Sequence, residues 1–543
     1  MGLRPGSAST LLFVGIVSLH GAGQAPAPES SSISAADLRR DVLVLASDEM
    51  EGRLVGTPGN RQAGRFIEER FEELGLTPIG ADRSYLHRFD LVIPSLGAAN
   101  QFAVTVGDRT STGSLGQDFY PERFSGTGQA EGHLVFAGFG ISAPLLRHDD
   151  YGHADINNRV VMVLDHEPGE DDPDSPFDGE ASSEHARSVR KALEAQQRGA
   201  AALLIVADLH NHSIPRSLRE GMRTTWQAVP PRVPRYELGA WVDRVRIPVL
   251  RISVEQAERM LTGNETDFER LLRQAETSGG ITPIARPDIV IQVEASLHRE
   301  RRPEYNVVGM IDGSDPLLRD EWIILCAHYD HEGITPQGIF NGADDDASGV
   351  AGLLEIAEAY ALAGARGLHP RRSILFAAWN AEERGMLGAW AYTEEPLAPL
   401  DRTIAVINMD MIGRHEEVPE NPGFRFRGLE PQTAESNANA VNLLGYSYSA
   451  DLRAAAEGAN VDRLQLRFRY DDNRSNLLRR SDHWPFLFQG IPALFVHTGL
   501  HPDYHTQRDQ PDRLDYDKMS RIVRLVHQLS WDLAQDASRP EYN

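Results

Sequence analysis

The sequence predicts an α/β protein in which a mixed, mostly parallel central sheet is flanked by helices and carries a smaller inserted α/β domain. From Trp322 onward, apolar runs of strand length alternate with helical segments, which is typical of a largely parallel sheet covered on both faces. From about Pro121 the chain changes to short strands separated by turns rich in glycine and proline. With 543 residues, 41% of them hydrophobic, the chain can fill more than one core.

The N-terminus has the layout of a secretory signal peptide. Arg4 precedes a short apolar stretch over residues 11–19, and small residues follow as far as Ala25. The apolar stretch is too short to span a bilayer, so no stable membrane anchor is expected. We predict a signal peptide over residues 1–25 and a linker over 26–34. The protein is then expected in the periplasm or outside the cell.

The main domain is predicted to begin with two helices and two strands over residues 35–119. Leu38, Val42 and Leu45 recur at helical spacing within 35–53, and an amphipathic helix follows and stops at Gly75. The inserted domain is predicted over residues 120–282 and the rest of the main domain over 283–543. The expected later strands of the main domain lie within residues 289–296, 306–313, 322–328, 373–379, 404–411 and 492–499, and the expected helices lie near 347–363, after 388, near 450–459 and at 522–533.

Polar residues follow four of these apolar strands. His328 and Asp330 end the first strand, and the other three strands lead to Glu382–Glu383, Asp410 and His505. Each residue alone is more simply a helix cap or a solvated loop residue. Together they form one set, because the carboxyl ends of parallel strands meet at one edge of a sheet. Imidazole and carboxylate groups gathered there are the ligands of a zinc-like ion.

Three consecutive acids, Asp344, Asp345 and Asp346, precede the predicted helix over 347–363. They could simply favour the positive end of its dipole. Taken together with the residues at the strand ends, one of these acids can instead bridge two cations. A carboxylate shared in this way holds two ions roughly 3.5–4 Å apart.

Composition and missing motifs exclude several other functions. The formal net charge is -25, with 79 acidic against 54 basic residues, which disfavours nucleic acid and anionic membranes as partners. His331–Glu332 and His415–Glu416 lack the second histidine of HExxH, and no GxSxG motif is present. Cys326, the only cysteine, lies in an apolar strand and is expected in the core. An exported protein without disulfides is most readily bacterial.

The motifs HYD at 328–330, GADDDASG at 342–349, AEE at 381–383, NMD at 408–410, SDHWPF at 481–486 and YHTQRD at 504–509 resemble those of the co-catalytic dizinc aminopeptidases. That family also includes glutamate carboxypeptidases, glutaminyl cyclases and the transferrin receptor. The inserted domain resembles a protease-associated domain. The resemblance implies a zinc exopeptidase fold, two Zn²⁺ ions and peptide substrates. In that family the peptide bond after the bridging aspartate is often cis, and the resemblance implies the same here.

By this resemblance, one ion is held by His328 and Asp410, the other by Glu383 and His505, and Asp345 bridges both. Asp344 and Asp346 are then supporting residues. We expect Asp330 to accept the second N–H of the His328 ring, and Glu382 to be the general base. The segment 481–486 is expected beside the metal site, because three adjacent residues cannot form a catalytic triad by themselves. Tyr504 is either an ordinary packed tyrosine or a hydrogen-bond donor to the reacting group.

The sequence therefore predicts an exported dizinc exopeptidase that removes N-terminal residues from peptides. A carboxypeptidase or dipeptidase on the same scaffold is the first alternative. A glutaminyl cyclase is disfavoured by the full ligand set and the inserted domain. A catalytically inactive, receptor-like binding protein has no chemical need for five ligands and Glu382. Side-chain specificity and oligomeric state are left open.

Overall fold

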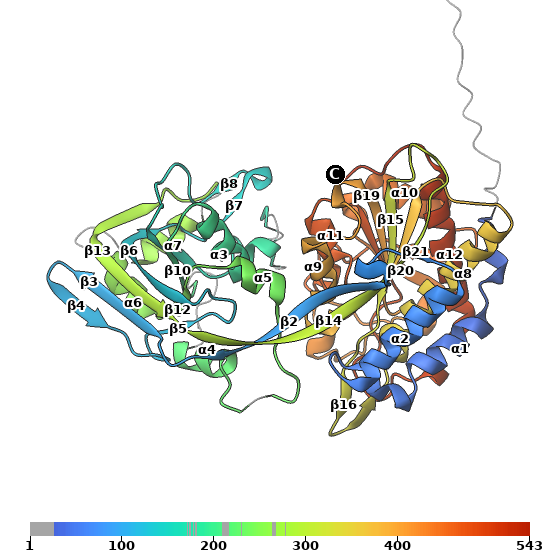
Figure 1. Cartoon of the computed structure of the whole chain (residues 1–543), viewed down its shortest axis with the longest axis horizontal. Coiled ribbons are helices and arrows are strands. Elements are labelled where there is room, and N and C mark those ends of the chain that lie inside the picture. Colours follow the sequence, from blue (N-terminus) through green and yellow to red (C-terminus); the bar gives the residue numbers. More distant parts are fainter. Residues whose placement is uncertain are drawn as a thin grey trace, which may run out of the picture.

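The computed structural model describes residues 26–543, apart from 171, 173–174, 178, 180–181, 209–216, 230, 263–267 and 277–278. The predicted signal peptide therefore lies outside the described residues. The chain forms two lobes (Figure 1). One lobe combines the beginning and the end of the chain, and the other is built from the middle. None of the described helices combines the length and apolar character needed to cross a bilayer.

The larger lobe is built on a mixed sheet with parallel strands at its centre. In spatial order its strands are β11 (Glu237–Leu238), β2 (Leu86–Leu96), β14 (Leu297–Ile311), β18 (Ser373–Trp379), β15 (Trp322–His328), β19 (Thr403–Met409), β22 (Ala493–His497), β20 (Ala440–Leu444) and β21 (Gln465–Arg467), with β1 (Thr77–Pro78) beside β14. The four strands from β18 to β22 are parallel to one another, whereas β14 and β20 flank them in antiparallel pairing. Every residue of β18, β19 and β22 is buried, as expected for strands covered on both faces. The predicted fold class is confirmed.

Helices cover both faces of this sheet. Alternate strand residues contribute to two hydrophobic clusters, one of them shared with α1, α2, α8, α10 and α12 and the other with α9 and α11. These helices are α1 (Ala35–Leu45), α2 (Pro58–Glu73), α8 (Gly349–Ala365), α9 (Leu387–Glu394), α10 (Ala450–Gly458), α11 (Trp484–Phe488) and α12 (Tyr516–Gln535). Local sequence explains where several of them start, because Ser34 and Thr57 cap α1 and α2 and Pro58 occupies the first turn of α2.

The smaller lobe has its own eight-stranded sheet. Its spatial order is β4 (Arg109–Thr112), β3 (Gln101–Val106), β13 (Ile284–Ala295), β6 (Gly128–Phe136), β9 (Val160–Leu164), β10 (Ala202–Val206), β12 (Val249–Ile252) and β5 (Phe119–Pro121). Its helices are α3 (Ser188–Gln197), α4 (Leu218–Thr225), α5 (Gly239–Arg244), α6 (Val254–Leu261) and α7 (Phe268–Ala275). Two short strand pairs lie outside these two sheets. In the smaller lobe, β7 (Ser142–Ala143) pairs with β8 (His148–Asp149), and in the larger lobe β16 (Gly333–Thr335) pairs with β17 (Gly338–Phe340) (Figure 1).

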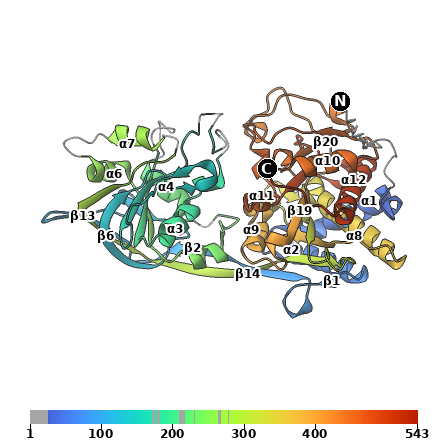
Figure 2. The ribbon, with the colours of Figure 1, turned by 90° about the horizontal axis from the view of Figure 1, so that it is seen from above.

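The second sheet extends beyond the predicted insert boundaries of 120 and 282. It includes β3 and β4 before residue 120 and β13 after residue 282. The physical reason is continuity: β2 and β14 pair along eleven residues and form a two-stranded bridge from one lobe to the other. Figures 1 and 2 show this bridge from two directions. Where these strands pass from one lobe to the other, the amino-acid composition does not change, so the sequence does not mark the boundary.

Candidate metal centre

The predicted site residues lie together at the carboxyl edge of the parallel strands. His328 is the last residue of β15, and Asp410 directly follows β19. Glu382 and Glu383 lie in the turn after β18, and His505 lies in the loop after β22. Because these four strands are parallel, their ends bring the side chains to one place.

The first group of ligand atoms comes from His328, Asp345 and Asp410. Nε2 of His328 lies 3.2 Å from Oδ1 of Asp345 and 3.7 Å from Oδ1 of Asp410. All three side chains are buried. Nδ1 of His328 donates a hydrogen bond to the main-chain carbonyl of Asp330 at 3.1 Å, so Nε2 can present a lone pair to a cation.

The second group uses the other oxygen of Asp345. Nε2 of His505 lies 3.0 Å from Oδ2 of Asp345 and 3.2 Å from Oε2 of Glu383. Each carboxylate oxygen of Asp345 therefore faces a different group of donors. This arrangement is the one that two cations sharing a bridging carboxylate require.

Unpartnered atoms support metal binding by these residues. Nε2 of His328 and Oε1 of Glu383 are buried and have no hydrogen-bond partner among the described residues. Buried polar atoms are normally hydrogen-bonded, and exceptions are often positions where an ion belongs. The nitrogen and carboxylate donors suit zinc, so the residues present fit the ions that the sequence predicted.

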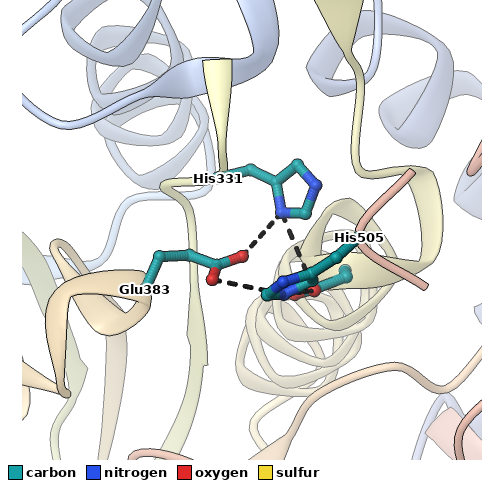
Figure 3. Close-up of side chains that lie close together, drawn as sticks. His331, Glu383 and His505 are labelled. Atoms are coloured by element: carbon teal, nitrogen blue, oxygen red, sulfur yellow. Dashed lines mark ion pairs between the residues drawn. The ribbon is translucent and has the colours of Figure 1, made fainter. Parts of the chain in front are cut away.

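The structure adds a fourth residue, His331, to the second group. Its Nδ1 lies 2.8 Å from Oε1 of Glu383 and 3.7 Å from Oδ2 of Asp345. The side chains of His331, Glu383 and His505 point toward one another (Figure 3). In the sequence, His331 stands out only as part of an incomplete HExxH motif. Its position three residues after His328 was the available signal, but the backbone leaves the strand at His328, so spacing could not show where the ring points.

Asp330 acts differently from the prediction. Its carboxylate is 3.8 Å from Nδ1 of His328, too far for the predicted hydrogen bond, which the Asp330 main-chain carbonyl accepts instead. The carboxylate accepts main-chain N–H groups of Glu382 at 2.9 Å and Glu383 at 3.3 Å. Asp330 therefore positions the turn that carries the two glutamates.

The two outer acids of the triplet hold main chain around the site. Asp346 accepts N–H groups from His328, Gly349 and Met411 at 3.2, 2.8 and 3.2 Å. Asp344 accepts the N–H of Gly413 at 2.7 Å. The supporting positions expected for these residues agree with these contacts. The peptide bond between Asp345 and Asp346 is cis, as the family resemblance implied.

The two adjacent glutamates have opposite electrostatic surroundings. Burial, together with the charges of Asp482, Glu383 and Asp410, holds the pKa of Glu382 well above its usual value, and the charge of His328 opposes this only in part. Burial acts on Glu383 in the same direction, but His505 and His331 lower the pKa of Glu383 below its usual range. Paired carboxyl groups whose pKa values are pushed apart often divide acid–base work between them. Glu382 is therefore the proton-accepting candidate, and Glu383 is the ionised ligand candidate.

Other polar residues orient the first group through hydrogen bonds to Asp410. Oγ of Ser481 donates to Oδ2 of Asp410 at 2.6 Å, and Asn408 donates to the same hydroxyl at 2.7 Å. Segment 481–486 thus packs beside the site, as predicted. Cys326 is buried and donates to Asn408 at 3.3 Å, which confirms its place in the core.

A small cavity of about 30 Å³ borders the site. It touches Asp345, Glu382, Asp410 and His505, and its other walls come from Met411, Leu477, Arg480, Phe495, His497, Leu500 and Tyr504. Burial and the charges of Asp345, Glu383 and Glu382 raise the pKa of Tyr504 well above its usual value. The Tyr504 hydroxyl therefore stays neutral and can donate a hydrogen bond.

Fold and site together define a protein with a candidate metal centre at the carboxyl edge of a mixed sheet. Residues 306–530 match the model of Peptidase family M28. This match supports the family resemblance of the motifs and the predicted enzyme class, a peptidase.

The relatives match only parts of their own length. "Aminopeptidase NAALADL1" of Mus musculus is 38% identical over 144 residues, 26% of this chain and 17% of that protein. "Probable glutamate carboxypeptidase AMP1" of Arabidopsis thaliana is 30% identical over 275 residues, 49% of this chain and 35% of that protein. The solved structure of BSAP, a zinc aminopeptidase from Bacillus subtilis, is 17% identical, covers 93% of this chain and 96% of that one, and has a TM-score of 0.42.

Proposed function

We propose that this chain is an exported dizinc aminopeptidase that removes N-terminal residues from peptides. The observation that carries the proposal is the position of Asp345, whose two oxygens lie 3.2 Å from His328 and 3.0 Å from His505. A single carboxylate between two donor groups has its chemical use in holding two cations together. His328 and Asp410 would hold one ion, and Glu383 and His505 would hold the other.

The proposed reaction is hydrolysis of a peptide bond with Glu382 as the general base. When bound, the ions would supply Lewis-acid chemistry, polarising the scissile carbonyl and making water nucleophilic at neutral pH. Glu382 would take a proton from the attacking water and pass it to the nitrogen of the leaving amine. Its carboxylate lies 4.0 Å from Nε2 of His328, close to the donors without belonging to either group.

The surroundings favour a substrate with a free amino group. Asp345, Glu382 and Asp410 border the small cavity, and Glu382 is not a proposed ligand, so its carboxylate is available to accept a hydrogen bond from the amino group of a substrate. One of the relatives carries the name of an aminopeptidase. Peptides are the proposed partners, and the net charge of -25 makes nucleic acid an unfavourable one.

A carboxypeptidase or dipeptidase on the same scaffold is the second candidate, favoured by the relative named as a probable glutamate carboxypeptidase. An assay of zinc-loaded protein on free, N-acetylated and C-amidated versions of one peptide separates the two. We expect the N-acetylated peptide to be resistant and the C-amidated peptide to be cleaved. Cleavage of the N-acetylated peptide together with resistance of the C-amidated one would reject the aminopeptidase.

A further inference from the structure

The two donor groups that meet at Asp345 differ in size. The first contains three residues, His328, Asp345 and Asp410, and the second contains four, His331, Asp345, Glu383 and His505. All ligand atoms within each group lie within 4.8 Å of one another. Two atoms bound to one zinc ion at about 2.0–2.2 Å are at most about 4.4 Å apart, so both groups are close to binding size.

The contact between His331 and Glu383 is not an ordinary hydrogen bond. Nδ1 of His331 lies 2.8 Å from Oε1 of Glu383, yet neither atom has a hydrogen-bond partner among the described residues. The distance of 2.8 Å is short enough for a hydrogen bond, so it is the angle between the two groups that is unsuitable. Two buried ligand atoms that lie close together without forming a hydrogen bond are explained if both point at a metal ion between them.

The geometry points to His331 as a fourth protein ligand of the ion that Glu383 and His505 hold. This inference rests on the proposed metal centre and adds to it a difference between the two ion positions. With four protein ligands, the Glu383 position is closed, whereas the His328 position keeps a place for water or substrate.

The difference has a chemical consequence. Zinc sites with four protein ligands are typically structural, and sites with three protein ligands and an open place are typically catalytic. The Glu383 position should therefore retain its ion more strongly than the His328 position. The small cavity borders both positions, because it touches Asp410 of the open one as well as Asp345 and His505.

Zinc retention against a chelator tests the assignment without measuring activity. Zinc-loaded protein is equilibrated with increasing dipicolinate, exchanged into buffer and analysed for zinc. We expect wild type to lose its two ions in separate steps. His331→Phe should move the second step to an at least about tenfold lower chelator concentration. Loss of a mere hydrogen-bond partner of a ligand already lowers metal affinity by about tenfold or more, and loss of a ligand should cost no less. His328→Phe should remove the weakly held ion and leave one that is released at the wild-type second step.

His527→Phe is a matched control, because both nitrogens of His527 are also buried and without a hydrogen-bond partner in the part of the chain that is described. Its ring packs on Tyr360 in α8, away from the metal centre. This control should follow the wild-type curve. Circular dichroism checks folding, and His331→Asn serves if the phenylalanine variant does not fold.

An unchanged second step in folded His331 variants would overturn the assignment. A wild type that holds a single zinc, which the His331 variants release more easily, would support His331 as a ligand and reject the two-ion site. A wild type that holds no zinc would reject both.

Discussion

At the scale of single residues, the site depends on groups whose charges are set by their neighbours. Burial disfavours a charged Asp345, but His331, His328 and His505 hold its pKa well below the usual value. Asp345 is therefore ready to accept cations without first losing a proton. The same burial with fewer positive partners raises the pKa of Glu382, so this carboxylate accepts a proton more readily than Asp345 does.

Glu355 provides a test of burial away from the metal centre. It lies in α8 and is 3% exposed, and burial together with Asp37, Glu358 and Asp41 raises its pKa to about 8. The folded state then binds a proton that the unfolded chain releases near pH 4.5, so stability falls as pH rises from about 4.5 to 8. Glu355→Gln should remove this loss and raise the free energy of unfolding at pH 8.5 by about 1–3 kcal/mol.

Urea unfolding at pH 5 and pH 8.5 measures this difference. Glu73→Gln on α2 is the control, because its side chain is 66% exposed, pairs with Arg70 at 3.1 Å and is not among the charges that raise the pKa of Glu355. The control should keep the wild-type pH dependence. Equal gains in the Glu355 variant at both pH values would show that the carboxyl group does not titrate in this range.

Four of the five predicted ligands follow parallel strands of the sheet, whereas the bridging role of Asp345 was implied by the family resemblance of the acid triplet. The sequence could not predict His331, because its ring direction depends on a turn that the backbone makes after His328. Nor could it show that the carbonyl of Asp330, and not its carboxylate, meets the His328 ring. Both differences arise in irregular backbone, where spacing does not determine direction.

At the scale of elements, a buried arginine fixes the loop that carries the acid triplet. Arg53 is fully buried and donates to the main-chain carbonyls of Leu45, Tyr329, Asn341 and Gly342 at 2.7, 2.9, 2.6 and 2.9 Å. It thereby joins the chain after α1 to the end of β15 and to the start of the triplet. The second group of donors is thus held partly by the N-terminal segment.

Arg53→Met should lower the free energy of unfolding by about 3 kcal/mol or more, because it leaves several buried carbonyls without donors. It should also weaken zinc retention, since the triplet loses its support. Chemical unfolding and zinc analysis measure the two effects. Arg61→Met removes an exposed arginine that donates to Gly56, and should cost less than about 0.5 kcal/mol. Similar losses in both variants would contradict the role assigned to Arg53.

At the scale of the whole molecule, the lobes share one hydrophobic cluster as well as the β2–β14 bridge. The cluster runs from β9 and β10 in the smaller lobe to β15 and β18 in the larger one. Trp390 of α9 lies 5.7 Å from Trp241 of α5, and the guanidinium of Arg187 lies over both rings. The lobes are therefore expected to unfold together.

Trp390→Ala should separate this unfolding into two calorimetric transitions, because it removes the ring at the centre of the contact between lobes. Deleting a buried tryptophan costs about 3–5 kcal/mol, which is enough to uncouple neighbouring units. Differential scanning calorimetry of zinc-loaded wild type should show one transition. Two transitions in wild type, or a single lowered one in the variant, would contradict a shared core.

The larger arrangement could be predicted only in part. Alternating strands and helices after residue 322 indicated the parallel centre of the main sheet. The crossing between lobes could not be located, because β2 and β14 are continuous strands and each contributes to the main sheet while leading into the second one. The sequence boundaries at 120 and 282 mark changes of composition inside the smaller lobe.

The central claim is that a two-ion site, open to water or substrate at the His328 position, supports the reaction while Glu382 moves the proton. The most direct measurement is kcat together with zinc content for wild type and Glu382→Gln on a free peptide. We predict two zinc ions in both proteins and a kcat at least about 100-fold lower in the variant, because the general base is lost and no ligand is removed. A variant that holds two zinc ions and turns over at the wild-type rate would contradict the account.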